Sequence, residues 1–212
     1  MKKIFFLLLF PGIFLFQSCE KEDIDIFHQD YFYYTFDFEK IQLYLLDNQV
    51  FLEFNTRHSE EEIIKFINNY FFFSETAPIL LSFENKIRCQ LNEKYSIKLK
   101  EILFVLNQDP SINYAVPVFS LKRNDESYII PINEILCDPL VSNSELKKLI
   151  NPYNLIVLDS KPESSYYRYK ITNIKTGFEP LNIANSLYET KKFHYCTPNF
   201  INVAMPCMNV IK

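Results

Sequence analysis

FHYCTPNF, at residues 193–200, nearly repeats an earlier stretch of the same chain, INYAVPVF at residues 112–119. Three pairs of residues correspond at an offset of 81: Tyr114/Tyr195, Pro117/Pro198 and Phe119/Phe200. A segment with helical periodicity precedes each copy, KLKEILFVLNQDPS before the first and EPLNIANSLYETKK before the second. A repeat period of this length is too long for a solenoid unit and predicts the duplication of a small domain.

Each copy also contains an earlier helix with a recognisable start. Ser59 lies three residues before Glu62, the spacing of a capping box, and Ser142 with Glu145 repeats it. Apolar residues then follow the pattern of one buried helix face: Ile63, Phe66, Ile67 and Tyr70 in the first copy, and Leu146, Leu149, Ile150 and Tyr153 in the second. We interpret the acidic residues 60–62 as helix capping, because the helix dipole favours them in a first turn.

The remaining segments of each copy are typical of strands and a second helix. Residues 41–45 and 50–54 predict a hairpin that turns at Asp47 and Asn48. PILLSF and NKIRCQL in the first copy match LIVLDS and YRYKITN in the second. The second helices have these apolar stripes: Leu99, Ile102, Leu103 and Leu106, and Leu181, Ala184, Leu187 and Tyr188, with Pro180 in the first turn of the latter helix.

This order predicts the fold class α+β: two tandem ferredoxin-like βαββαβ units, each a four-stranded antiparallel sheet with two helices on one face. The expected domains are a signal peptide at 1–18, a tether at 19–31, units at 32–121 and 126–204, and a C-terminal tail at 205–212.

The N-terminus predicts an exported lipoprotein. Lys2 and Lys3 precede an apolar run of about 13 residues that leads to Cys19, the anatomy of a secretory signal. The segment resembles a bacterial lipobox, in which Cys19 is lipidated and anchors the protein to the membrane. The charged EKEDID that follows resembles the export tag of Bacteroidota surface lipoproteins, so we expect an outer-membrane, surface-exposed location. The alternatives are a plain cleaved signal and an uncleaved anchor.

Composition argues against several functions. The net charge of -4 and the absence of a Lys/Arg run argue against nucleic acid as a partner. Gly12 and Gly177 are the only glycines, so no glycine-rich loop can hold a nucleotide phosphate. The histidines His28, His58 and His194 lie in no catalytic motif, and we expect no enzyme, cofactor or metal site.

The cysteines bear on redox state. In the ferredoxin-like order the first and last strands of a unit are antiparallel neighbours, so Cys137 and Cys196 are expected to lie close enough to consider a disulfide. The first copy has Leu52 and Ala115 at about these places, so the alternative is a pair of small buried residues.

NQVFLEF with SEEEIIKFINNY, and NEILCDP with NSELKKLINPY, each followed by the Tyr-Pro-Phe strand, resemble the propeptide domains of bacterial subtilisin-like serine proteases. The resemblance covers residues 39–203 and implies a folding chaperone and temporary inhibitor, whose open sheet face packs on the protease. It also implies that the segment after the last strand lies in the protease cleft. The partner-binding residues implied are Asn199, Phe200, Ile201, Asn202, Val203, Ala204 and Met205.

The sequence thus leads to one hypothesis and two alternatives. We expect a membrane-anchored protein without catalytic activity, with a serine protease as partner. The alternatives are a generic surface binding module, which would use exposed Tyr and Phe of the sheet, and a truncated remnant of a longer protease, since no catalytic domain follows residue 212.

Overall fold

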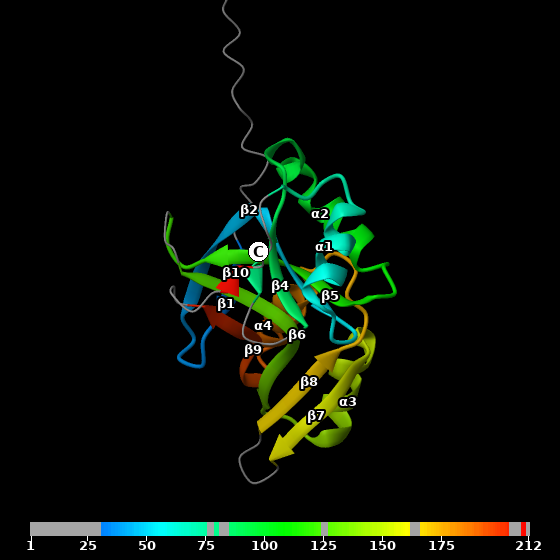
Figure 1. Cartoon of the computed structure of the whole chain (residues 1–212). Coiled ribbons are helices and arrows are strands. Elements are labelled where there is room, and N and C mark those ends of the chain that lie inside the picture. The colour runs from blue at the N-terminus through cyan, green and yellow to red at the C-terminus, as the bar shows by residue number, and fades with distance from the viewer. Residues whose placement is uncertain are drawn as a thin grey trace, which may run out of the picture.

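The computed structural model describes residues 31–75, 79–80, 85–123, 127–161, 166–203 and 209–210, which form a mixed α+β fold (Figure 1). The first half, residues 31–123, contains β1 (Tyr31–Tyr34), β2 (Lys40–Phe54), α1 (Glu60–Asn68), β3 (Ile79–Leu80), β4 (Lys86–Gln90), η1 (Glu93–Lys98), α2 (Leu99–Leu106) and β5 (Ile112–Ser120). The second half, residues 127–203, contains β6 (Tyr128–Pro139), α3 (Asn143–Ile150), η2 (Asn151–Tyr153), β7 (Leu155–Lys161), β8 (Tyr166–Ile171), α4 (Glu179–Glu189) and β9 (Phe193–Val203), and β10 (Asn209–Val210) follows.

The strands form one antiparallel sheet in the order β10-β3-β4-β2-β5-β6-β8-β7, with β1 beside β2 and β9 beside β6. In the first half the neighbours are therefore β3-β4-β2-β5. In the second half they are β9-β6-β8-β7. Phe119 of β5 and Ile129 of β6 form a single register pair, and this short pairing joins the sheet of the first half to that of the second.

The expected turn at Asp47 and Asn48 is wrong. β2 runs without a break from Lys40 to Phe54, and at the expected turn its pairing with β5 shows a register shift, between Leu46 and Val50. Such a bulge absorbs turn-forming residues inside a strand. The chain reverses earlier, between β1 and β2, where the amide of Thr35 donates to the carbonyl of Glu39 at 2.9 Å.

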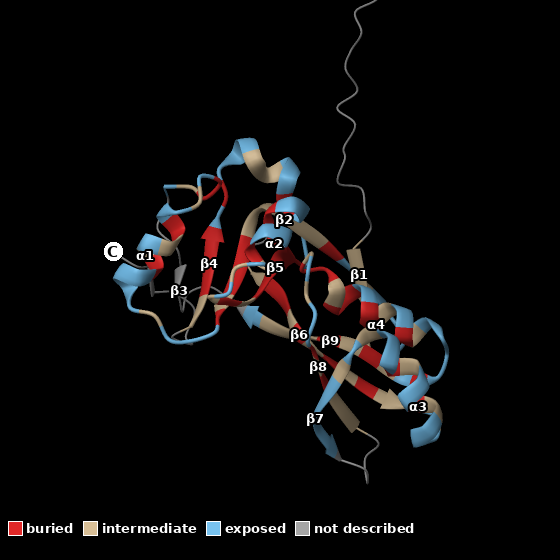
Figure 2. Cartoon of the chain, turned by 90° about the vertical axis from the view of Figure 1, so that its right-hand side faces the viewer, coloured by how far each residue is buried: buried red, intermediate tan, exposed pale blue. Residues whose placement is uncertain are grey.

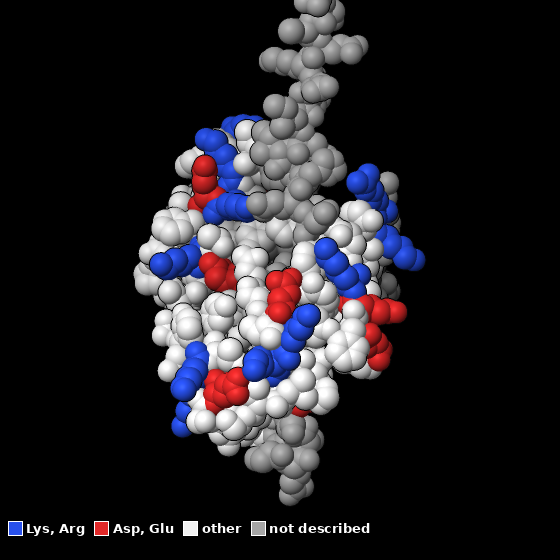
Figure 3. Space-filling model, turned by 180° about the vertical axis from the view of Figure 1, so that it is seen from behind, with Lys and Arg blue, Asp and Glu red and all other residues white. Residues whose placement is uncertain are grey.

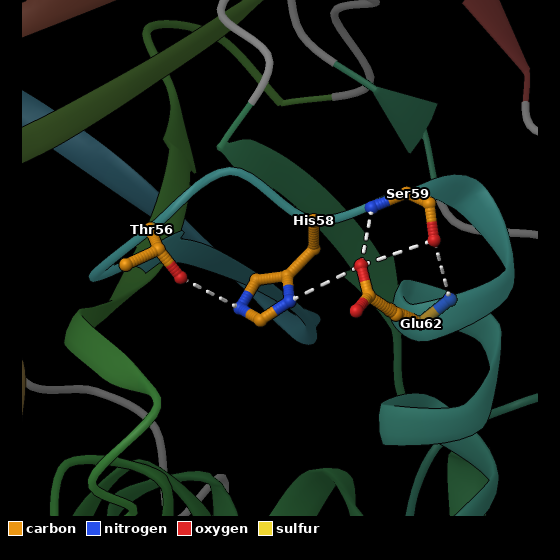
Figure 4. Close-up of polar contacts among 4 residues, drawn as sticks. All are labelled: Thr56, His58, Ser59 and Glu62. Carbon is orange, nitrogen blue, oxygen red and sulfur yellow. Dashed lines mark hydrogen bonds and ion pairs between the residues drawn. The ribbon is translucent and has the colours of Figure 1, made fainter.

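The two first helices begin differently. α1 has the expected capping box: Glu62 N donates to Ser59 Oγ at 3.3 Å and Ser59 N donates to Glu62 Oε2 at 2.7 Å (Figure 4). Ser142 occupies the same position before α3, but its hydroxyl lies 3.1 Å from Ser144 Oγ and caps nothing. Glu145 is held instead by Lys192 at 3.0 Å. The expected second capping box is therefore wrong.

The predicted helix stripes face the core. All four residues predicted for α2 are buried, and so are Leu181, Ala184 and Leu187 of α4, while Tyr188 is half-buried. One core lies under α1 and α2 and also takes in Phe178, Leu181 and Phe200 of the second half. Another lies under α3 and α4. Figure 2 shows buried residues along the central strands and an exposed β7.

The halves also meet at Gly177, in the loop before α4. Its φ of +79° is in the left-handed region, and a Cβ there would lie 2.7 Å from Ala115 O and 2.9 Å from Val116 Cα. Asn107 ties the same loop to β5, since its Nδ2 donates to Ala115 O at 2.9 Å and to Lys175 O at 3.4 Å. Only glycine fits this close approach.

Candidate binding face

The sheet of the second half has a face that its helices do not cover. Along β6, Ile135 and Cys137 are buried on the side of α3 and α4, so the alternation of a strand sends their neighbours to the other side. We call that side the open face and define it by these half-buried residues of β6, β8 and β9: Glu134, Leu136, Asp138, Arg168, Lys170, Tyr195, Thr197 and Asn199.

Register places these side chains next to one another. Leu136 is opposite Arg168 on one side and Thr197 on the other, so it lies at the centre of the face. Glu134 is opposite Lys170, and Asn199 Nδ2 donates to Glu134 Oε2 at 2.8 Å. Charged and polar groups thus surround Leu136 on the open face.

Two polar atoms of the open face are buried without a hydrogen-bond partner in the part of the chain that the structure describes: Asp138 Oδ1 and Arg168 Nε. The pKa of Tyr195, the register partner of Asp138, is raised by burial and by that carboxylate. A buried polar atom without a partner costs about 1–3 kcal/mol. A bound protein that supplied hydrogen bonds here would recover part of that free energy.

A hollow of about 660 Å³ adjoins the open face. It is lined by Leu136, Tyr195 and Thr197 from the second half, by Tyr33 of β1, and by Thr35 and Phe36 from the β1–β2 turn. Phe36 is 68% exposed, so an aromatic side chain stands in solvent at the rim. On the far side, β7 exposes three consecutive apolar residues, Ile156, Val157 and Leu158. Exposed apolar side chains therefore lie at two edges of the open face.

The corresponding face of the first half is covered. Phe51, Tyr114, Val116 and Val118 lie on the side of the sheet away from α1 and α2, and each is at most 1% exposed. Ile130, Ile132 and Ile201 of the second half pack on them. The Arg88 guanidinium of the first half is also stacked on the Tyr128 ring of the second half, 3.8 Å from the ring centroid. Among the described residues, this face of the sheet is therefore buried in the first half and uncovered in the second.

The structure places most of the predicted partner-binding residues inside β9. Phe200 to Val203 pair with β6, whereas Asn199 lies in β9 at the register shift that follows. The Phe200 ring packs on Tyr33 with 4.8 Å between centroids, and Ile201 contacts the covered face of the first half. Ala204 and Met205 lie outside the described residues, and so does the lipidation candidate Cys19. Of this set, Asn199 belongs to the open face.

Sequence reasoning missed the residues that make the open face. Leu136 lies in NEILCDP and Arg168 in YRYKITN, but neither was singled out as a site residue. The signal that could have found them was the alternation of side chains along the predicted strands, which the burial of β6 and β8 follows. Tyr33 and Phe36 were visible as part of an aromatic stretch but could not be placed beside β9, which is far away in sequence.

The surface charges give little sign of a polyanion site. Figure 3 shows the molecule from behind, with basic and acidic side chains interspersed among uncharged ones on that face. Within the described residues no group of three His, Cys, Asp or Glu side chains could hold a metal ion, and no helix is long and apolar enough to cross a membrane.

His58 has polar neighbours that invite comparison with a catalytic triad. Its Nε2 lies 3.4 Å from Thr56 Oγ1 and its Nδ1 lies 3.7 Å from Glu62 Oε2 (Figure 4). Glu62 already caps α1, which lowers the pKa of its carboxyl, and Ser59 donates its hydroxyl to the same carboxylate at 3.0 Å. A triad needs a hydroxyl bonded to the imidazole and free to attack a substrate. This group is therefore interpreted as a helix cap.

The structure is thus that of a mixed α+β protein whose antiparallel sheet has an uncovered face in its second half. Comparison with family models and with curated proteins finds no match. Among solved structures, the small subunit of acetolactate synthase from Thermotoga maritima is similar over 75% of this chain and 98% of that chain, at 9% identity and a TM-score of 0.25. A likeness this weak carries no functional conclusion.

Proposed function

We propose that this chain is a non-catalytic, lipid-anchored protein of the outer membrane, built of two tandem ferredoxin-like units, that binds a subtilisin-like serine protease through the open face. The strand orders β5-β2-β4-β3 and β9-β6-β8-β7 support the tandem units, because each is the order of a βαββαβ unit. The resemblance to protease propeptides supports the class of partner.

One observation carries the binding function: the open face of the second half is uncovered, whereas the same face of the first half is buried. We infer that one chain binds one protease molecule. The first unit then acts as a support that holds β6 and β9 in place through Ile130 and Ile201.

The pairing of β9 limits which residues are free to enter a protease cleft as the inhibitory segment. The last four residues of β9, Phe200 to Val203, pair with the first four residues of β6, Tyr128 to Pro131. Releasing them to reach a protease cleft would break those hydrogen bonds and expose Ile201. The segment that enters the cleft is therefore proposed to lie after Val203, within residues 204–212, and its entry requires β10 to leave its two-residue pairing with β3.

A titration of the full-length chain, held in detergent, against a panel of subtilisin-type proteases tests this function. We expect saturation at one chain per protease, inhibition that disappears when residues 204–212 are deleted, and binding that remains. Arg168→Glu, next to the central Leu136 of the open face, should weaken binding at least about tenfold.

Lys148→Glu is the matched control, because Lys148 is exposed on α3, on the covered side of the sheet. It reverses the same charge and should leave affinity unchanged. Equal losses for both variants would point to a general charge effect and reject the open face as the site. If no protease of the panel is bound by the intact chain, the partner class is wrong and a generic surface binding module takes its place.

A further inference from the structure

Two cysteines of the second half face each other across neighbouring strands. Cys137 of β6 and Cys196 of β9 are register partners in the antiparallel pair, and both side chains have no exposed surface. In the structure they are separate thiols, and after the larger effect of burial the neighbouring Cys196 raises the pKa of Cys137 further. They lie in the core under α3 and α4, on the side away from the open face.

This placement meets the distance requirement of a disulfide. Directly opposite residues in an antiparallel pair have Cα atoms about 4.5–5.5 Å apart, inside the range of about 4.4–6.8 Å that disulfides span. Opposite residues also send their side chains to the same side of the sheet. The third cysteine that the structure describes, Cys89, is opposite Val50 and has no sulfur across from it.

The first half shows what the same position holds without sulfur. Leu52 and Ala115 are register partners on the equivalent strands β2 and β5, and both are fully buried. Packing alone is therefore satisfied by two apolar residues of unequal size. A matched pair of cysteines adds nothing to packing that this pair lacks, but it adds the ability to cross-link.

We propose that Cys137 and Cys196 are joined by a disulfide in the exported protein, which locks the last strand of the second half to its first. The proposal is independent of the protease and uses only the expected export to an oxidising compartment. The bond closes a long loop that includes α3, β7, β8 and α4. A cross-link around so much chain stabilises by restricting the unfolded state.

The chemistry is two successive thiol–disulfide exchanges with an oxidant of the disulfide class. One cysteine, as a thiolate, attacks the oxidant and forms a mixed disulfide while one thiol leaves; the second cysteine then attacks that mixed disulfide and releases the second thiol. Two electrons pass to the oxidant and two protons leave the protein thiols. Burial raises the pKa of Cys137, so reaction must precede the closure of β9 onto β6.

Oxidative refolding tests the proposal without relying on export. The full-length chain, reduced and unfolded in denaturant, is refolded in oxidised and reduced glutathione, unfolded again, alkylated without reductant and mapped by mass spectrometry. We expect a linked peptide pair that contains Cys137 and Cys196, with Cys89 alkylated. Alkylation of both Cys137 and Cys196 in the refolded protein would overturn the proposal.

The double variant Cys137→Leu/Cys196→Ala copies the first half and serves as the matched control. Reduction should lower the Tm of the oxidised native chain by about 10 °C and leave the Tm of the double variant unchanged. An equal response of both proteins to the reductant would also contradict a stabilising cross-link at this pair.

Discussion

At the scale of single residues, Asp109 shows how a side chain sets a pH dependence. Its carboxylate accepts from Tyr70 at 2.6 Å and from the amide of Ser111 at 2.8 Å, and Ser111 Oγ donates to it as well. Burial alone would raise the pKa of Asp109, but these hydrogen bonds outweigh it and lower that pKa below its ordinary value. The same contact raises the pKa of Tyr70 to about 12, after the larger effect of burial.

A lowered carboxyl pKa contributes stability that is complete above the unfolded pKa and is lost as pH falls through the folded one. Asp109→Asn should therefore lower the free energy of unfolding by roughly 1 kcal/mol at neutral pH, a modest value because the carboxylate is partly exposed. Urea titrations should show the difference from the native chain narrowing from about pH 5 to about pH 2. Tyr70→Phe removes one donor and should give part of the effect; a difference that stays constant with pH would argue against this hydrogen-bonded carboxylate.

At the scale of elements, the two copies provide an internal comparison of helix caps. Ser59→Ala removes the hydroxyl that accepts from Glu62 N, so the Tm should fall by about 2–4 °C. Ser142→Ala removes a hydroxyl that caps nothing and should change the Tm by less than about 1 °C. Thermal unfolding followed by circular dichroism measures both Tm changes. Equal changes for the two variants would show that the capping hydrogen bond does not set the cost of losing the serine.

At the scale of the whole molecule, the shared cores predict that the halves unfold together. Ile130 of β6 is fully buried on the first half, and Phe178 and Leu181 enter the core under α1 and α2. Ile130→Ala should therefore lower the free energy of unfolding by about 2–4 kcal/mol for both halves. Hydrogen exchange of amides in β4 and in β8 should report the same loss; protection in β4 that persists when β8 has opened would show that the halves are independent.

Local patterns determined much of this protein. The stripe of Leu99, Ile102, Leu103 and Leu106 identified α2 because helical periodicity is encoded by neighbouring residues. The cap at Ser59 was predictable for the same reason, and the repeat of the Tyr-Pro-Phe stretch located β5 and β9. The opposition of Cys137 and Cys196 followed from the predicted strand order, although their precise register did not.

Tertiary structure alone decided which face is available. Nothing in the sequence near Tyr114 and Val116 shows that Ile130 and Ile201 cover them, because those contacts join segments far apart in the chain. The bulge that carries β2 through Asp47 is likewise stabilised by pairing with β5 against the local turn preference. Residues therefore encode their elements locally, whereas the free surface of this protein is set by long-range packing, which buries this face of the sheet in the first half and leaves it uncovered in the second.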